Sequence, residues 1–308
     1  MIICITPNPA IDRTIILPSL VLGSVHRAEQ IIVAAGGKGL NVARAIGILG
    51  GEPLCMGFAG GHAGHLLEDL AQNAELKFSW TWVKSETRTC TILVSPKGDA
   101  TVINEPGTSV SKRDWKRLQR DVQKYISSAA MVCVCGSLPP NSPANDVQGL
   151  LSMLVATSKQ VWVDTSSRAL DVALTVPGVC IKVNGDEIGQ SLGFEVKDVV
   201  SARRALVMLG ERGVTAGVIT LGSAGALLAT NEGRWHAQGP RVRVISTVGS
   251  GDSFLGGLVS ALDGGKYWPE VLRDAIAAGT ANALSAGGGQ FAFEEFAHIR
   301  EQVQVEAW

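Results

Sequence analysis

The stretch TVGSGDSFLGG, Thr247 to Gly257, raises the question of fold and function for this 308-residue chain. A glycine-rich turn precedes a single acid, Asp252, and an apolar run follows, which predicts a helix that begins near the acid. Helix N-termini present unpaired backbone N–H groups, so Gly249, Ser250 and Gly251 are candidates for an anion hole. Asp252 would then take the proton of a hydroxyl group that attacks a phosphoryl group. The alternative is that Asp252 only caps the helix.

Strand-like and helix-like segments alternate along most of the chain around this stretch. The short β-rich runs are ICIT, LCMGF, MVCVC, VWVD, VCIKV and GVITL, and helical patterns separate them, such as LNVARAIGIL, AGHLLEDLAQN, 144–157 and 202–211. The segment 252–286 is mainly helical in pattern. Strands spaced by helices predict βαβ units and a mostly parallel sheet. The length allows two average domains, or one large α/β domain with an appendage.

Two regions interrupt this alternation, at about 13–33 and 78–104. They contain the short runs TIIL, IIV, KFSWTWV, TCTILVS and ATVIN, and SPKGD (95–99) predicts a hairpin turn. These runs alternate apolar and polar residues, as strands do in a sheet with one solvated face. We predict that both regions form one small β appendage, which covers a cleft or pairs with a second copy. The alternative is that they add strands to the main sheet.

Composition and charge exclude several classes of protein. The net charge is −1 and no basic cluster is present, which argues against a nucleic-acid partner. No apolar run reaches the ~18 residues of a membrane span, and the N-terminus MIICITPNPA lacks the basic region of a signal peptide. We therefore expect a cytoplasmic protein without a membrane partner. The six cysteines are scattered without C-x-x-C, and Cys133 and Cys135 are predicted to be core thiols rather than metal ligands.

A second glycine-rich stretch, AAGGKGLNVARA (34–45), leads into an amphipathic helix. Its pattern favours a cradle for a phosphate or sugar phosphate, with Lys38 as a point charge. The chain contains neither the P-loop pattern G-x-x-x-x-G-K-[ST] nor the dinucleotide pattern G-x-G-x-x-G. The alternative is close packing of a helix on a strand through glycine.

Four more motifs follow predicted strands, where open α/β sheets bind ligands. NPAID places Asp12 where it can bind a polyol, and CGSLPP places Ser137 near a substrate. KVNGDE puts Asn184 and Glu187 on one face of a helix. TLGSAGA is a glycine-rich turn between two strands. Taken singly, these motifs are also compatible with ordinary turns, helix caps and a plain hairpin.

The motifs together resemble the ribokinase-like, phosphofructokinase-B group of carbohydrate kinases, from ITPNPAID to TANALSAGG. NPAID, GGKGLNVA, CGSLPP and VDTSSRAL most resemble the subgroup of 1-phosphofructokinase and tagatose-6-phosphate kinase. The resemblance implies one ribokinase-like α/β domain over 1–308, a three-layer sandwich with a mostly parallel central sheet and a small β-sheet lid. It also implies ATP, Mg²⁺, in many members a stimulating K⁺, and a homodimer formed through the lid.

The resemblance also assigns roles to individual residues. The catalytic set is Asp252 as the base, with the backbone of Gly249, Ser250 and Gly251 as the anion hole. The sugar-binding set is Asp12, Gly36, Gly37, Asn41 and Arg88. Candidates for the sugar's existing phosphate are Lys38, Arg88, Arg27 and Ser137, with Arg27 reaching from the lid toward a neighbouring subunit. The nucleotide set is Lys182, Asn184, Glu187, Thr220, Gly222, Ser223, Gly225 and Asn282, with Glu187 holding Mg²⁺ through water.

The expected function is an ATP-dependent phosphotransferase that acts on the free primary hydroxyl of a ketohexose monophosphate. The acceptor would be fructose-1-phosphate, giving fructose-1,6-bisphosphate, or tagatose-6-phosphate, giving tagatose-1,6-bisphosphate. Alternatives are a kinase of fructose-6-phosphate or of an unphosphorylated sugar, and a catalytically silent sugar-phosphate sensor. Lys38 and Arg88 argue against a neutral sugar, and Asp252 argues against a pure sensor. A Rossmann oxidoreductase fails because the glycine fingerprint is missing.

Overall fold

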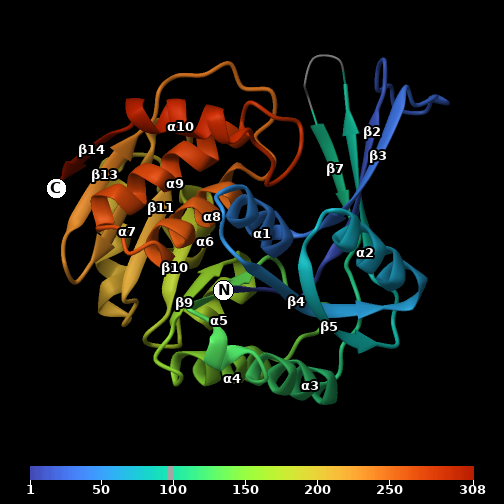
Figure 1. Ribbon diagram of the computed structural model, residues 1–308, viewed down its shortest axis with the longest axis horizontal. Helices are drawn as coiled ribbons and strands as arrows, with labels where there is room; N and C mark the ends of the chain where they lie inside the picture. The colour runs from blue at the N-terminus through green and yellow to red at the C-terminus, as the bar shows by residue number, and fades with distance from the viewer. Residues whose placement is uncertain (96–99) are drawn as a thin grey trace.

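The computed structural model describes residues 1–95 and 100–308 of the chain (Figure 1). Its buried apolar strands form one large sheet. Its ten strands run in the order β14-β13-β12-β11-β10-β9-β8-β1-β4-β5. The parallel strands are β1 (Ile2–Thr6), β4 (Pro53–Gly60), β5 (Lys77–Val83), β8 (Met131–Cys135), β9 (Gln160–Asp164), β10 (Cys180–Asn184) and β11 (Ala216–Thr220). The antiparallel strands at one edge are β12 (Ala226–Thr230), β13 (Arg234–Gln238) and β14 (Gln304–Ala307). The predicted mostly parallel sheet is confirmed.

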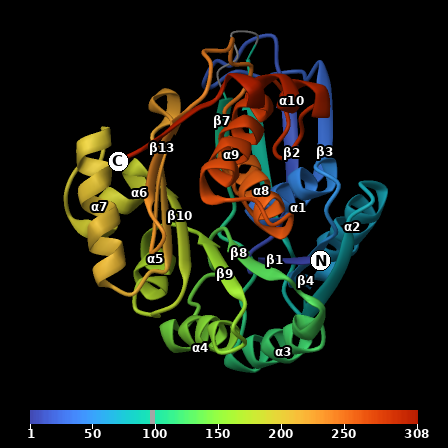
Figure 2. The same cartoon turned by 60° about the vertical axis from the view of Figure 1, so that its left-hand side comes forward.

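Helices cover both faces of this sheet, because successive residues of each strand point to opposite faces. Ile2 and Cys4 of β1 enter one core, and Ile3 and Ile5 enter the other. The first core lies under α1 (Lys38–Ile48), α2 (Gly61–Asn73), α8 (Ser250–Asp263), α9 (Trp268–Asn282) and α10 (Phe293–Gln302). The second lies under α3 (Lys112–Gln123), α4 (Ala144–Val155), α5 (Ser167–Ala173), α6 (Gly185–Leu192) and α7 (Val199–Glu211). Figure 2 shows these helices around the strands, so the predicted three-layer sandwich is confirmed.

A smaller sheet of four strands, in the order β3-β2-β6-β7, projects from the main body (Figure 1). It is formed by β2 (Ala10–Ile16), β3 (Gln30–Gly36), β6 (Arg88–Val94) and β7 (Ala100–Asn104). KFSWTWV is not part of it, which corrects the expected 78–104 segment of the appendage. That run is β5, which pairs with β4 of the main sheet and buries Trp80 in the core. The hairpin turn predicted at 95–99 falls largely on 96–99, outside the described residues.

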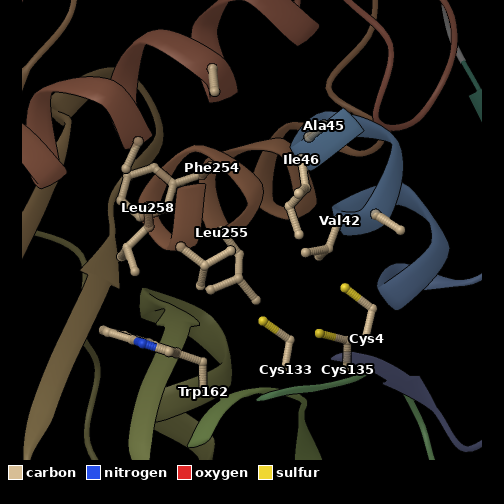
Figure 3. Close-up of a cluster of buried hydrophobic side chains, with 14 of the residues drawn as sticks. Cys4, Val42, Ala45, Ile46, Cys133, Cys135, Trp162, Phe254, Leu255 and Leu258 are labelled. Atoms are coloured by element: carbon tan, nitrogen blue, oxygen red, sulfur yellow. The ribbon is translucent and has the colours of Figure 1, made fainter. Parts of the chain in front are cut away.

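The cysteines all lie within the protein as free, buried thiols. Figure 3 shows Cys4, Cys133 and Cys135 below side chains of α1 and α8, including Val42 and Leu255. Cys133 and Cys135 share one face of β8, as their spacing predicts. Among the helices of the described chain, none has the length and apolar character needed to cross a membrane.

Candidate active site

A cleft of about 990 Å³ lies at the carboxyl ends of β10 and β11, beside the start of α8. Open α/β sheets bind ligands at this edge. The predicted residues that line it are Lys38, Lys182, Asn184, Glu187, Thr220, Gly222, Ser223, Gly225, Gly249, Ser250, Gly251 and Asp252. TLGSAGA joins β11 to β12 through the 3₁₀ turn η2 (Gly222–Ala224), so this motif is both a hairpin and a wall of the cleft.

The glycine-rich turn before Asp252 ends in a helix N-terminus. Gly249 is the N-cap of α8, with a φ of 78°, and a Cβ atom there would lie 2.4 Å from Gly288 Cα. Glycine alone satisfies both conditions without strain. Of the predicted anion hole, the Ser250 N–H already donates to Thr247 O at 3.2 Å. Among the described residues, no acceptor is found for the backbone N–H of Gly251, nor for that of Asp252 beside it. Because both residues line the cleft, the start of α8 has the features of an anion-binding site.

The Asp252 side chain does not cap the helix. It lies in the first turn of α8, and no side chain makes a capping hydrogen bond there. Instead, Asn41 Nδ2 of the neighbouring helix α1 donates to Asp252 Oδ2 at 2.8 Å. Asp252 is 6% exposed as a whole residue and belongs to the cleft lining. The capping alternative therefore does not account for this acid.

The surroundings of Asp252 make it a stronger base than an exposed aspartate. Burial, and then the charge of the Asp164 carboxylate, raise the pKa of Asp252 above its usual range. Lys38, Lys182 and the Asn41 hydrogen bond act in the opposite direction without cancelling this effect. A carboxylate with a raised pKa accepts a proton more readily, which suits a general base.

Asp164 lies at the end of β9 and binds two lysines at the floor of the cleft. Lys38 Nζ donates to its Oδ1 at 2.8 Å, and Lys182 Nζ donates to its Oδ2 at 2.7 Å. The carboxyl group is completely buried. Burial opposes its charge, but the two ammonium groups outweigh this and hold the pKa of Asp164 below its usual range. The lysines are thereby fixed next to the start of α8, since a Cβ atom on Gly251 would lie 2.8 Å from Lys182 Nζ.

Asn184 and Glu187 form the N-terminal cap of α6. Glu187 N donates to Asn184 Oδ1 at 2.8 Å, and Asn184 N donates to Glu187 Oε2 at 2.9 Å. This capping box is the helix-cap alternative for the motif KVNGDE. The other oxygen of Glu187, Oε1, accepts from Lys38 Nζ at 3.3 Å. The cap therefore also aims a carboxylate into the cleft.

Asp12 and Gly36 lie together on the small sheet, on β2 and β3. A Cβ atom on Gly36 would lie 2.1 Å from Asp12 Cγ, so glycine leaves the space that this carboxyl group fills. Burial raises the pKa of Asp12 to about 6, although Arg44 and Arg88 favour the charged form. The charge of Asp252 also raises the pKa of Asp12. The two acids thus belong to one electrostatic group that spans the small sheet and α8.

Arg88 and Ser137 are both held near the end of β1 by Asn8. Arg88 donates from Nη2 to Asn8 O at 3.1 Å and from Nη1 to Glu105 O at 3.1 Å. Asn8 Nδ2 donates to Ser137 Oγ at 3.2 Å. In the described part of the chain, Arg88 forms no ion pair with a carboxylate. Its charge is thus positioned by carbonyl groups but not neutralised.

Three of the predicted site residues lie where they do not directly contact a ligand in the cleft. Asn282 is completely buried; its Nδ2 donates to Val248 O at 2.8 Å, and its Oδ1 accepts from Ser253 and Gln290. Asn282 therefore stabilises the turn before α8 and is not part of the cleft lining in the described residues. Arg27 is exposed in the loop between β2 and β3. Gly37 is the N-cap of α1 and packs against Thr6.

Sequence reasoning missed three residues of this site: Asp164, Asn8 and Arg44. Asp164 is the last residue of β9 and Asn8 comes soon after β1, so both lie at strand ends, and these positions carried a usable signal. Arg44 lies three residues after Asn41 on α1, and its Nη1 donates to Asn41 Oδ1 at 2.8 Å. Residues three positions apart lie on one face of a helix, so the spacing of Asn41 and Arg44 also carried a usable signal.

Comparison with known proteins finds relatives that match almost the whole chain. Tagatose-6-phosphate kinase from Staphylococcus epidermidis is 29% identical over 308 residues, which cover 99% of each chain. The structure of phosphofructokinase-2 from Escherichia coli in complex with substrates and products is 27% identical, with a TM-score of 0.90 over 98% of each chain. A Thermotoga maritima structure named "Possible 1-phosphofructokinase" shares the fold, with a TM-score of 0.86 at 22% identity over 100% of this chain and 99% of that one.

The family assignment covers almost the whole chain. The model described as "pfkB family carbohydrate kinase" matches residues 6–294, which include both glycine-rich stretches and every element that lines the cleft. The chain therefore belongs to the pfkB family of carbohydrate kinases, enzymes that transfer a phosphoryl group to a sugar hydroxyl.

Proposed function

We propose that this protein is an ATP-dependent kinase of a ketohexose monophosphate, with tagatose-6-phosphate or fructose-1-phosphate as the acceptor. The observation that carries the proposal is the buried Asp252 carboxylate. It lies in the cleft at the start of α8, beside two backbone N–H groups that have no acceptor among the described residues. The full-length similarity to a tagatose-6-phosphate kinase supports this substrate class. The small sheet would act as a lid that excludes water from the sugar.

The proposed reaction moves one phosphoryl group and one proton. The primary hydroxyl oxygen of the sugar attacks the γ-phosphorus of ATP, and the bond from that phosphorus to the bridging oxygen of ADP breaks. Asp252 takes the proton of the hydroxyl group. The N–H groups of Gly251 and Asp252 stabilise the charge on the transferring group. Lys38 and Lys182, both fixed by Asp164, add positive charge beside this position.

The lining of the cleft fits a nucleotide. Val242, Val244, Ile276 and Ala283 provide an apolar wall, and the helix N-terminus lies in the same cleft. Arg241 also lines it and makes no ion pair within the described residues, so its charge is available to phosphate.

No group of three or more His, Cys, Asp or Glu in the described residues could hold a metal ion by itself. Mg²⁺ normally binds through one or two carboxylates plus substrate phosphates, so Glu187 would hold it through water and it would neutralise phosphate charge.

The sugar would lie between Asp12, Asn41 and Asp252, with its existing phosphate toward Arg88. Arg88 is favoured for this phosphate because carbonyl groups position it and because it forms no ion pair with a carboxylate in the part of the chain that the structure describes. Ser137, tied to Asn8, lies on the same side. Lys38 is less suited to this role than expected, because Asp164 and Glu187 already bind its ammonium group in the nucleotide cleft. We assign Lys38 to the junction between the two substrates.

The test is a measurement of ADP release with Mg-ATP and each of three acceptors: tagatose-6-phosphate, fructose-1-phosphate and fructose-6-phosphate. Free fructose is the control for the need for a phosphate group. We expect one of the first two acceptors to exceed the others by orders of magnitude in kcat/KM. Turnover of free fructose at a similar rate would contradict a sugar-phosphate site. Binding of ATP and a sugar phosphate without ADP release would instead favour the sensor.

Fructose-6-phosphate is the second candidate acceptor. The structure of Escherichia coli phosphofructokinase-2 in complex with fructose-6-phosphate is 26% identical to this chain, with a TM-score of 0.89. The same protein has been solved in complex with potassium, which makes K⁺ a candidate activator here. Replacing K⁺ by Na⁺ in the ADP-release assay measures that requirement directly.

Sugar binding should depend on pH through Asp12. Its pKa is raised to about 6, so the carboxylate takes up a proton as the pH falls below that value and becomes a poorer acceptor for sugar hydroxyls. We expect the KM of the sugar phosphate to rise between pH 7 and pH 5 more steeply in the wild type than in Asp12→Asn. The substrate's own phosphate titrates near pH ~6 in both proteins, so the difference between them isolates Asp12. Parallel profiles would contradict this assignment.

We also propose that the protein forms a homodimer through the small sheet. Ile31, Ile32, Val33, Val102 and Ile103 of this sheet are all more than a third exposed, which is costly for a monomer. We expect light scattering to give twice the 32.3 kDa chain mass, and Ile103→Lys to shift the protein toward monomer. Arg27, in the loop beyond these strands, would then be near the partner. A wild-type monomer at micromolar concentration would contradict this arrangement.

A further inference from the structure

Arg44 of α1 is linked to the candidate base through Asn41. Within the described residues, it is not part of the cleft lining and forms no ion pair with a carboxylate. Its Nη1 donates to Asn41 Oδ1 at 2.8 Å, and its Nη2 donates to Ala35 O of β3. Asn41 in turn donates to Asp252 Oδ2 at 2.8 Å. The side chains of Arg44, Asn41 and Asp252 therefore form a continuous chain of hydrogen bonds from β3 of the small sheet to α8.

The chemistry of the guanidinium group fixes the direction of this chain. An arginine side chain only donates hydrogen bonds, whereas an asparagine amide donates from one end and accepts at the other. Asn41 must therefore turn its oxygen to Arg44 and its NH₂ group to Asp252. This holds one oxygen of the Asp252 carboxylate and leaves the other for a hydroxyl proton. If the amide flipped, its oxygen would face the carboxylate and repel it.

Arg44 also supplies positive charge to both acids of the candidate sugar site. Burial lowers the pKa of Arg44, and the charges of Asp12 and Asp252 act against this effect. No ion pair joins Arg44 to either acid in the described chain, so the charge acts over distance and leaves both carboxylates free for substrate. The other groups that act on Asp252 are Asp164 of β9, Lys38 of α1 and Lys182 of β10.

We propose that Arg44 is a positioning residue for the phosphoryl-transfer reaction, which orients the Asn41 amide so that Asp252 faces the substrate hydroxyl. This inference rests on the proposed function, because it assigns Asp252 as the base. The competing explanation is purely structural: Arg44 would only tie α1 to β3 through the Ala35 carbonyl. The two explanations differ in what they predict for Asn41 and for the acidity of Asp252.

The test uses Arg44→Met, Asn41→Ala and the double variant, with Arg203→Met as the matched control. Arg203 is a half-buried arginine of α7, 4.8 Å from the Trp308 ring centre and outside the cleft. A misplaced base costs about 10²-fold in rate, so we expect Arg44→Met to lower kcat by this amount with the KM of ATP unchanged. The double variant should lose little more than Asn41→Ala alone, because both changes break one chain. Full additivity of the two losses would overturn the proposal.

A readout without turnover separates this inference from the proposed function. The carboxyl carbon of Asp252 can be followed by ¹³C NMR, with its signal assigned by its loss in Asp252→Asn. Without Arg44, both the hydrogen bond and the positive charge that favour the carboxylate are weakened, so its titration should move to higher pH. The same direction is expected for Asn41→Ala, and no change for Arg203→Met. An unchanged titration in Arg44→Met overturns the role of Arg44 even if the enzyme is active, whereas a shifted titration in a protein inactive on every acceptor overturns only the proposed function.

Discussion

Replacing Asp252 by asparagine should lower kcat by about 10²–10⁴-fold, the usual contribution of a general base. Asparagine keeps the shape of the side chain and can still bond to Asn41, but it cannot accept the hydroxyl proton. The change also leaves the N–H groups at the start of α8 in place. We therefore expect the KM of ATP to change little. Steady-state ADP release, measured at saturating concentrations of both substrates, gives kcat directly.

The matched control is Asp263→Asn, because Asp263 lies on the same helix at its exposed end. It should retain wild-type kcat. If Asp252→Asn also retained most of the turnover, the phosphoryl acceptor would be deprotonated by another group or by water. Thermal unfolding of both variants checks that a loss of rate comes from chemistry and not from unfolding.

Much of the fold could be predicted because its elements are set by local pattern. The buried runs of β1, β4, β8, β10 and β11 alternate with helices whose apolar faces have the helical period. The prediction assigned β5 to the wrong sheet, because this strand alternates apolar and polar residues like the strands of the small sheet. β5 is an edge strand of the ten-stranded sheet. An edge strand has a neighbouring strand on one side only, so it is partly exposed to solvent in either sheet. Residue pattern alone does not separate these two environments.

The parts of the site that lie at glycine-rich turns and strand ends could be predicted from the sequence. The parts that depend on contacts between residues far apart in the sequence could not. The turn before Asp252 and the cap formed by Asn184 and Glu187 are visible in short motifs. In contrast, the bond between Asn41 and Asp252 joins residues 211 positions apart. Asp164 binds two lysines only because β9 lies beside β10 and α1 begins above the same strand ends. That arrangement is a property of the strand order, which motifs do not encode.

Replacing Asp164 by asparagine should give the second large effect, on stability. Lys182 is 4% exposed and its ion-pair partner is Asp164, so the change leaves a buried ammonium group uncompensated. Breaking a buried ion pair in this way costs about 3–5 kcal/mol. Lys38 suffers less, because it is a third exposed and keeps Glu187. The free energy of unfolding from urea titrations at pH 7 measures the loss.

The double variant Asp164→Asn/Lys182→Met tests this explanation, because it removes the unpaired charge along with its partner. Apolar replacement of a buried pair is often neutral or better for stability, so the double variant should be more stable than Asp164→Asn alone. If the double variant were less stable than the single one, the penalty would come from lost packing or hydrogen bonds. The control is Glu195→Gln, which breaks the exposed ion pair with Lys197 and should cost far less than Asp164→Asn.

The pH dependence gives the sign of the Asp164 contribution. The pKa of this carboxyl group is held below its usual range in the folded protein, whereas an unfolded aspartate titrates near ~3.9. The charged group therefore stabilises the fold fully above the unfolded value, and this contribution is lost as the pH falls through the folded one. We expect the stability difference between wild type and Asp164→Asn to be constant from pH 7 to about pH 5 and to shrink below about pH 4. A difference that grew on acidification would mean that Asp164 is protonated in the folded protein, and its two lysines would then require other partners.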